Sequence, residues 1–246
     1  MVTLEPQAET ASALAARLAA LDWDGIEASL RERPYAATPP VLTAEECAAL
    51  IALYGDASRF RSRIVMERHR FGLGDYQYFA EPLPPLVEAL RRLAYPPLAR
   101  IANRWMTTLG EAQRFPPTLA AFRRVCARHG QRQPTPLLLH YEAGGYNCLH
   151  QDVYGAIAFP LQVVAFLSRP GRDYTGGEFL LVEQRPRAQS IGEALVCDQG
   201  QLLVFTNRIR PVAGTRGPYR TQVRHGVSPV RSGSRYTLGI IFHDAR

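Results

Sequence analysis

The feature that most constrains the fold is a series of short apolar segments in the C-terminal part of the chain, with no helical pattern between them. Segments rich in β-branched and aromatic residues, separated by Gly, Pro and Asn turns, predict strands at 137–141, 161–168, 178–182, 194–197, 201–205, 221–227 and 235–242. Many short strands without intervening helices favour a closed or double-sheet all-β architecture such as a jelly roll. The sequence therefore predicts a mainly β domain at 135–246.

Residues 1–134 have mainly helical patterns, and we expect them to pack on this sheet as an extension. Leu14 and Leu18 recur at helical spacing within 8–33, and Asp24 is expected to cap a second short helix. Thr43 and Glu46 form a capping box that opens another helix, which we expect to end near residue 55. Further helices are predicted at 85–93, 97–106 and 117–126, a linker at 35–40, a strand at 63–70 with its turn at 72–75, and a boundary at 130–136.

The composition is that of an ordinary soluble protein, with 46% hydrophobic and 21% charged residues, and it indicates neither disorder nor a membrane protein. The longest apolar run, Phe159 to Leu167, is far too short to cross a bilayer and is typical of a buried strand. The N-terminus has no basic residue before Arg17, which argues against a secretory signal. We therefore expect a cytoplasmic protein with no membrane partner, and the sequence leaves its oligomeric state open.

The net charge of +7 comes from a chain whose 29 basic residues are all arginine. A basic balance can indicate a nucleic-acid partner, but the arginines are spread along the chain without a block or tail. A GC-rich genome explains the preference for arginine, alanine and proline better than a nucleic-acid partner does. None of the four cysteines forms a Cys-x-x-Cys pair, so we expect reduced packing residues and no zinc site.

A possible metal site centres on the tripeptide HQD. His150 and Asp152 are two residues apart and would project from the same face of a strand, so both could reach one cation. Two ligands hold a metal poorly, and His225 is the candidate for the third. Two histidines and one carboxylate on one side of an iron form the facial arrangement of non-haem Fe(II) oxygenases. Ten residues beyond His225 stands Arg235, followed two residues later by Thr237.

Other donors fit this pattern less well. His69 and His129 belong to the extension, His140 has no acid two residues away, and His243 follows the last predicted strand. A lone histidine such as His225 is more often a core residue, but its spacing to the arginine and the strand-rich context favour a ligand.

The stretch from 137 to 246 resembles the double-stranded β-helix domain of the 2-oxoglutarate and Fe(II) dependent dioxygenases, closest to the prolyl-hydroxylase-like branch. Four segments carry the resemblance: LLLHYEAGGYNCLHQD, TGGEFLLVE, GQLLVFTNR and HGVSPVRSGSRYTLGIIF. Singly each is weak, but they occur in the family's order over 110 residues. The resemblance implies a cupin-like jelly roll flanked by helices.

The resemblance also implies the chemistry. Fe(II) would be held by His150, Asp152 and His225, and 2-oxoglutarate would chelate the iron while its far carboxylate meets Arg235. A guanidinium suits this task because its planar fork gives two parallel hydrogen bonds. Tyr141 and Thr237 are further candidates for contacts with the co-substrate, against the simpler interpretation of packing residues. The implied reaction consumes O2, with ascorbate as a possible reductant, and converts 2-oxoglutarate to succinate and CO2 while a substrate is hydroxylated.

Several other polar residues have two interpretations. The arginines and tyrosines of the 59–78 segment either guard a solvated edge strand, which we favour, or form a wall that contacts substrate. The residues of this wall would be Arg68, Arg70, Tyr76 and Tyr78. Residues that flank the metal-ligand candidates are either ordinary loop residues, which we favour, or contact the co-substrate or target, and these are Asn147, Gln151 and Tyr154. Arginines near the distal histidine are either solvated, which we favour, or bind an acidic substrate, and these are Arg208, Arg210 and Arg224.

Three functions follow from these features. The first is hydroxylation of a small molecule, a free amino acid or a peptidyl residue. The second is oxidative demethylation of alkylated nucleic acid, although those enzymes carry a second arginine where this chain has Ile241. The third is a non-catalytic jelly-roll binding module, which the intact ligand set argues against. The substrate and the stereochemistry of oxidation are not readable from the sequence.

Overall fold

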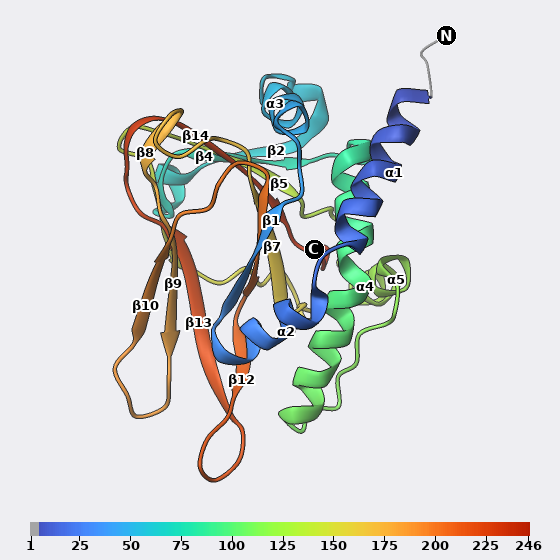
Figure 1. Ribbon diagram of the computed structural model, residues 1–246, viewed down its shortest axis with the longest axis vertical. Helices are drawn as coiled ribbons and strands as arrows, with labels where there is room; N and C mark the ends of the chain where they lie inside the picture. Colours follow the sequence, from blue (N-terminus) through green and yellow to red (C-terminus); the bar gives the residue numbers. More distant parts are fainter. Residues whose placement is uncertain (1–4) are drawn as a thin grey trace.

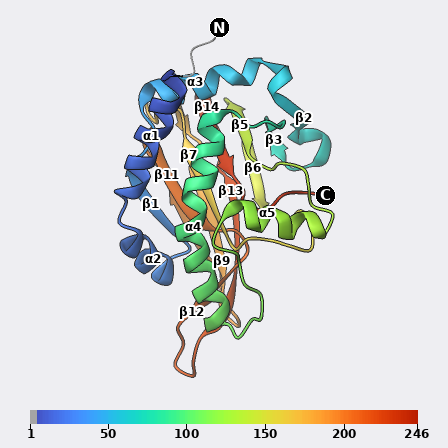
Figure 2. The same cartoon turned by 90° about the vertical axis from the view of Figure 1, so that its right-hand side faces the viewer.

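The computed structural model describes residues 5–246 and has three layers, two facing antiparallel β-sheets and a layer of helices on the outside of the larger sheet (Figure 1). The turned view shows α4 and α1 lying across the outer face of this sheet (Figure 2). The double-sheet arrangement confirms the predicted mainly β, jelly-roll class with flanking helices. No helix in the described range is long and apolar enough to cross a membrane.

The larger sheet contains eight strands in the order β1-β11-β7-β14-β5-β4-β2, with β8 paired to β14. Their bounds are β1 Tyr35–Pro40, β2 Phe60–Val65, β4 Asp75–Phe79, β5 Leu137–Glu142, β7 Leu161–Phe166, β8 Tyr174–Gly176, β11 Gln201–Thr206 and β14 Val230–Ile240. Strands β1, β2 and β4 come from the first 134 residues and join strands of the predicted β domain. The division at residue 134 stays a prediction.

The smaller sheet contains six strands in the order β10-β9-β13-β6-β3, with β12 paired to β13. Their bounds are β3 Gly72–Leu73, β6 Tyr146–His150, β9 Phe179–Gln184, β10 Ile191–Leu195, β12 Ile209–Val212 and β13 Tyr219–Val227. Because β6 pairs with β13, the middle of the chain is placed beside a segment 75 residues later, with His150 opposite His225. The two predicted imidazoles are therefore neighbours by register.

The helices are α1 Glu5–Ala19, α2 Trp23–Glu32, α3 Ala44–Ala52, α4 Pro85–Thr108 and α5 Leu119–Arg128, with short 3-10 turns at 53–55, 57–59 and 66–69. The predicted capping box is confirmed, since Thr43 and Glu46 bond reciprocally at the start of α3. Asp24 was the wrong cap for α2. The side chain of Asp22 accepts the amide hydrogen of Gly25 instead.

One predicted break does not exist. The expected helices at 85–93 and 97–106 are a single helix, α4, with Pro96 and Pro97 inside it. An interior proline costs a helix about 3 kcal/mol. Leu90, Leu98 and Trp105 of α4 are buried in one continuous core, and this packing outweighs the cost.

Three local predictions before residue 80 are also wrong. Residues 35–40 form β1, the edge strand of the larger sheet, which pairs with β11. Its two prolines are tolerated because an edge strand has one side without a partner, where a missing N–H group breaks no hydrogen bond of the sheet. The strand predicted at 63–70 ends at Val65 and gives way to a 3-10 turn. The expected turn at 72–75 contains β3 and the start of β4, which belong to different sheets.

The apolar residues form two main cores. One lies between the helices and the outer face of the larger sheet and includes Leu238 and Ile240 of β14. The other lies between the two sheets and includes Phe166, Phe179 and Phe205. Because strand residues alternate between faces, β14 sends Arg235, a predicted site residue, to the space between the sheets.

Candidate active site

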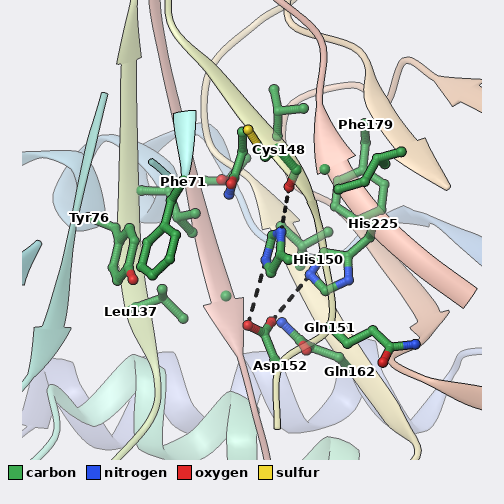
Figure 3. A pocket seen from close by; sticks show the side chains of 18 of the residues that line it. Phe71, Tyr76, Leu137, Cys148, His150, Gln151, Asp152, Gln162, Phe179 and His225 are labelled. Carbon is green, nitrogen blue, oxygen red and sulfur yellow. Dashed lines mark hydrogen bonds and ion pairs between the residues drawn. The ribbon is translucent and has the colours of Figure 1, made fainter. Parts of the chain in front are cut away.

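A cavity of about 360 Å³ lies between the two sheets (Figure 3). Two of its lining residues, Phe71 and Leu149, are exposed, so the cavity opens to solvent beside β6. It is lined by all six residues predicted for the site, His150, Asp152, His225, Arg235, Tyr141 and Thr237. The remaining wall is mostly apolar, with Leu137, Val164 and Phe205 among its residues. A mostly apolar cavity with a few convergent polar groups is the usual form of a small-molecule site.

The three predicted metal ligands converge in this cavity. The Nε2 atom of His225 lies 3.2 Å from Oδ2 of Asp152, and Nε2 of His150 lies 3.6 Å from Oδ1 of the same carboxylate. The potential ligand atoms of the three residues all lie within 4.8 Å of one another. Two imidazole nitrogens and one carboxylate oxygen at this separation can share a single divalent cation.

The surroundings fix how both imidazoles face the cavity. Nδ1 of His150 donates its proton to the carbonyl oxygen of Cys148 at 2.8 Å, which turns Nε2 toward Asp152. The ring of His225 is buried between Phe179 and Phe205, with ring centroids 6.0 and 4.8 Å away. Its Nδ1 has no hydrogen-bond partner among the described residues, and its Nε2 faces Asp152.

Asp152 differs from the prediction in its backbone. It does not share a strand with His150, because β6 ends at that histidine and Asp152 lies just beyond it. The side chain of Asn207 holds the displaced residue, accepting the amide hydrogen of Asp152 at 2.9 Å and donating to its carbonyl oxygen. This two-bond clamp replaces the missing strand ladder and keeps the carboxylate in the cavity.

Burial and neighbouring charges together set the ionisation of Asp152 and His225. Burial alone would raise the pKa of Asp152, but the hydrogen bond to His225 and the two neighbouring imidazoles lower the pKa well below its ordinary value. Burial lowers the pKa of His225, and the nearby His150 lowers it further. An ionised carboxylate beside a neutral imidazole is the form that binds a metal ion.

A chain of two phenols supports the carboxylate from the side. Tyr154 donates its hydroxyl hydrogen to Oδ1 of Asp152 at 2.7 Å, and Tyr78 donates to the oxygen of Tyr154 at 3.0 Å. Burial and the adjacent Asp152 raise the pKa of Tyr154 well above its ordinary value, so its proton stays available for donation.

We expect Tyr154→Phe to weaken metal binding by about 10- to 100-fold, the usual effect of losing a hydrogen bond to a ligating carboxylate. A metal titration of the folded chain measures this change. Tyr95→Phe is the matched control, because it removes a hydroxyl bonded to the carbonyl of Pro116 outside the cavity. Equal metal affinity in Tyr154→Phe and the wild-type chain would contradict the assigned role.

Arg235 lies on the opposite sheet from His225 and lines the same cavity. It is only 1% exposed, and none of its three guanidinium nitrogens has a hydrogen-bond partner within the described part of the chain. The rings of Tyr141, Phe166 and Tyr174 surround its charge, with centroids 5.5, 5.6 and 5.8 Å from the guanidinium carbon. Such contacts offset only part of the desolvation of a buried cation.

Local backbone geometry makes room for this guanidinium. Gly177, from the sequence TGGE, has a φ of +64°, and a Cβ atom there would come within 2.9 Å of the Arg235 side chain. Both the positive φ and the close approach require glycine. The motif that resembled a family turn therefore has a physical role beside Arg235.

Tyr141 and Thr237 lie near Arg235, Tyr141 on the neighbouring strand β5 and Thr237 two residues further along β14. Tyr141 is opposite Arg235 in the register of β5 and β14, and its hydroxyl accepts a hydrogen bond from Asn147 at 3.2 Å. Burial raises the pKa of Tyr141 to about 12, so the phenol remains a proton donor. Thr237 is buried on the same strand as Arg235 and lines the cavity.

The other candidates divide into cavity residues and structural residues. Arg70 and Tyr76 line the cavity, as in the interpretation that we did not favour, while Arg210 is buried in an ion pair with Glu183. Gln151 lines the cavity and also donates to the carbonyl oxygen of Val223. Of the alternative histidines, His140 bonds to Ser234 on β14, and His69, His129 and His243 do not line the cavity.

Sequence reasoning missed two residues. Asn207 follows β11 directly, and Gln162 interrupts the apolar run of β7 and lines the cavity with a buried Oε1 that lacks a partner in the described residues. An uncharged polar residue inside an apolar strand, or just after one, was the available signal. Neither belongs to a motif, so neither was selected.

A further histidine beside this region predicts a pH dependence of stability. Burial lowers the pKa of His243 to about 4, and its Nδ1 accepts the amide hydrogen of Phe159, which only the neutral ring can do. The unfolded chain binds the proton more readily, so lowering the pH from about 7 to about 5 should cost roughly 2 kcal/mol of unfolding free energy at this group. Urea unfolding across this range measures the loss. His243→Asn should show a shallower dependence, and an unchanged slope would contradict the assignment.

The family comparison matches most of the chain. A family model named Oxygenase-NA, described as "Oxygenase, catalysing oxidative methylation of damaged DNA", matches residues 74–245. The uncharacterized protein Rv2227 of Mycobacterium tuberculosis strain H37Rv is 51% identical over 167 residues, which cover 68% of this chain and 72% of that protein.

Solved structures with the same fold include a prolyl-4-hydroxylase of Pseudomonas putida, with a TM-score of 0.50 and 16% identity over 91% of this chain and 99% of the other. An oxidoreductase of the 2OG-Fe(II) oxygenase family from Burkholderia pseudomallei gives a TM-score of 0.52 and 16% identity over 91% of each chain. A prolyl hydroxylase from Trichoplax adhaerens, in complex with a peptide fragment of hypoxia inducible factor, gives a TM-score of 0.50 and 14% identity over 99% of this chain and 94% of the other.

These matches agree with the geometry of the cavity, in which two imidazoles and a carboxylate converge. The resemblance predicted from the sequence motifs is confirmed. This chain belongs to the Oxygenase-NA family of oxygenases and has the double-stranded β-helix fold of the 2-oxoglutarate and Fe(II) dependent dioxygenases, including prolyl hydroxylases.

Proposed function

We propose that this chain is a 2-oxoglutarate- and Fe(II)-dependent dioxygenase that hydroxylates an organic substrate in the cavity between its sheets. The observation that carries the proposal is the buried guanidinium of Arg235, which has no partner among the described residues and lines the same cavity as His150, Asp152 and His225. A buried cation is costly unless an anion meets it. A dicarboxylic keto acid supplies one carboxylate for Arg235 and a second for a metal ion.

The residues present fit Fe(II). His150 and His225 each have an Nε2 atom facing the carboxylate of Asp152, and one negative charge with two neutral nitrogens suits a divalent cation of intermediate softness. When bound, iron together with O2 would supply the oxidation. One oxygen atom of O2 enters succinate as 2-oxoglutarate loses CO2, and the other enters the substrate as a hydroxyl group.

The chain's own groups position the reactants. The guanidinium fork of Arg235 gives the far carboxylate two parallel, charge-assisted hydrogen bonds. Tyr141 on the adjoining strand β5 and Thr237 on β14 itself can each donate a hydroxyl hydrogen. The apolar wall of Leu137, Val164 and Phe205 excludes water from the reacting centre. Ascorbate as a reductant and a cytoplasmic location stay predictions.

The family description gives a second candidate for the substrate, namely damaged DNA. The chain is basic, and an arginine and an aromatic residue, Arg70 and Phe71, line the cavity. Both features suit a nucleic-acid substrate. The first candidate, a small molecule or peptidyl residue, is suited by the size and apolar wall of the cavity.

Succinate formation tests the proposed reaction. The folded chain, supplied with Fe(II), 2-oxoglutarate, ascorbate and O2, should convert the keto acid to succinate, slowly without a substrate and faster with the right one. His150→Ala should abolish this turnover, while His129→Ala, on the surface away from the cavity, should retain it. Equal succinate formation by the wild-type and His150→Ala chains would refute the proposal.

A further inference from the structure

Exposed apolar side chains gather at one place, the mouth of the cavity. Seven large apolar side chains are exposed among the residues whose burial is described, and five of them lie within 71–73 and 146–153. These are Phe71, Leu73, Tyr146, Leu149 and Val153, which we call the rim. Single exposed apolar residues need no explanation, but such clustering marks a binding surface.

Two paired strands, β3 and β6, bring the 71–73 and 146–149 parts of the rim side by side. Leu73 of β3 is opposite Tyr146 of β6, and the carbonyl oxygen of Phe71 accepts the amide hydrogen of Cys148. Phe71 and Leu149 also line the cavity, so the rim leads from the sheet edge into the candidate active site (Figure 3). A molecule bound on the rim can therefore insert one group between the sheets.

The charge beside the rim is positive. Arg68, His69 and Arg70 are exposed directly before Phe71, against one acid, Glu67, in the same turn. The ring of His69 stacks on Phe71, with centroids 5.3 Å apart and planes 22° from parallel. The backbone of Arg70 is left-handed, with a φ of 58°, and its side chain lines the cavity.

We propose that the rim is the docking surface for single-stranded nucleic acid, with bases stacking on Phe71 and Tyr146 and the phosphates meeting Arg68 and Arg70. Aromatic faces next to arginines are how proteins hold unpaired strands. Two of the three metal-ligand candidates are buried, so a base within a duplex cannot reach them, whereas an unstacked base can enter the cavity. This inference rests on the proposed function, since it assigns the surface that would bring one of the two candidate substrates to the same site.

Binding of a labelled oligodeoxynucleotide to the full chain, measured by fluorescence anisotropy, tests the proposal without requiring turnover. The single strand should bind more tightly than its duplex. Phe71→Ala should weaken this binding by about 5- to 100-fold, the effect of losing one stacked base. Arg70→Asn, in which asparagine tolerates the left-handed backbone, should make the dependence of log K on log salt shallower by about 0.7.

Matched controls lie on the opposite edge of the smaller sheet and its hairpin. Ile191→Ala removes an equally exposed apolar side chain, and Arg187→Asn removes an arginine with the same left-handed backbone, at a φ of 59°. Both control variants should bind the oligonucleotide as the wild-type chain does. Equal losses in the control and rim variants, or no binding of single strands at low salt, would overturn the proposal.

Binding of a proline-containing peptide tests whether the partner of the rim is a protein and not a nucleic acid. If the peptide binds and Phe71→Ala weakens that binding, while the oligonucleotide does not bind, the rim is a peptide surface and the inference is wrong. Succinate formed without substrate separates the two proposals. Succinate formation without oligonucleotide binding would contradict only the docking surface. Oligonucleotide binding without succinate formation would contradict only the proposed reaction.

Discussion

An Arg235→Met chain should be more stable than the wild-type chain in the absence of co-substrate, and 2-oxoglutarate should no longer stabilise it. The wild-type guanidinium is buried and has no partner in the described residues, so an unbranched apolar side chain removes a desolvated charge. We expect a gain of about 1–3 kcal/mol in the free energy of unfolding, because the surrounding aromatic rings already offset part of the cost. Urea unfolding with and without 2-oxoglutarate measures both effects.

The same substitution at a second buried arginine provides the control. Arg91 is fully buried like Arg235, but it donates to Asp244 at 2.7 Å and to two backbone carbonyls. Arg91→Met should therefore destabilise the chain by about 3–5 kcal/mol, since it leaves a buried carboxylate without this partner. Destabilisation of similar size in both variants would show that Arg235 is a structural residue.

Asp152→Ala should retain the fold and lose both metal binding and turnover. Asp152 is the one anionic member of the ligand set, and the remaining rings of His150 and His225 face each other with centroids 4.2 Å apart. A cation between two neutral rings would lose several kcal/mol of stabilisation, so succinate formation should fall by about 10³-fold or more.

A metal titration and a succinate assay check this result, and circular dichroism reports the fold. Asp173→Ala is the matched control, because that carboxylate pairs with Arg169 in a loop away from the cavity. Undiminished iron uptake by the Asp152→Ala chain would mean that the metal binds elsewhere.

The class of fold was predictable because it depends on pattern. Short runs of apolar residues bounded by turn residues, as at 161–168, 201–205 and 235–242, are a local property of the sequence, and the structure places β7, β11 and β14 there. Taken alone, residues 35–40 predict a linker, because a strand with two prolines is defined only by its partner β11. The join between the halves of α4 was missed for a related reason, since its prolines are tolerated through tertiary packing.

The site was predictable where one motif fixed chemistry and spacing together. The sequence selected His150 and Asp152 as a pair, and the cavity contains both. It could not show that Asp152 leaves the strand, because the clamp by Asn207 joins residues 55 positions apart. Nor could it show that Tyr154 supports the carboxylate, since a hydrogen bond across a turn has no periodic signal.

The most direct measurement is a calorimetric titration of 2-oxoglutarate into the chain loaded with Fe(II) in the absence of O2. If the ligand set and Arg235 hold one keto acid together, binding should show a single site and should be lost in both Asp152→Ala and Arg235→Met. Binding that needs no metal, or that survives in both variants, would contradict this account.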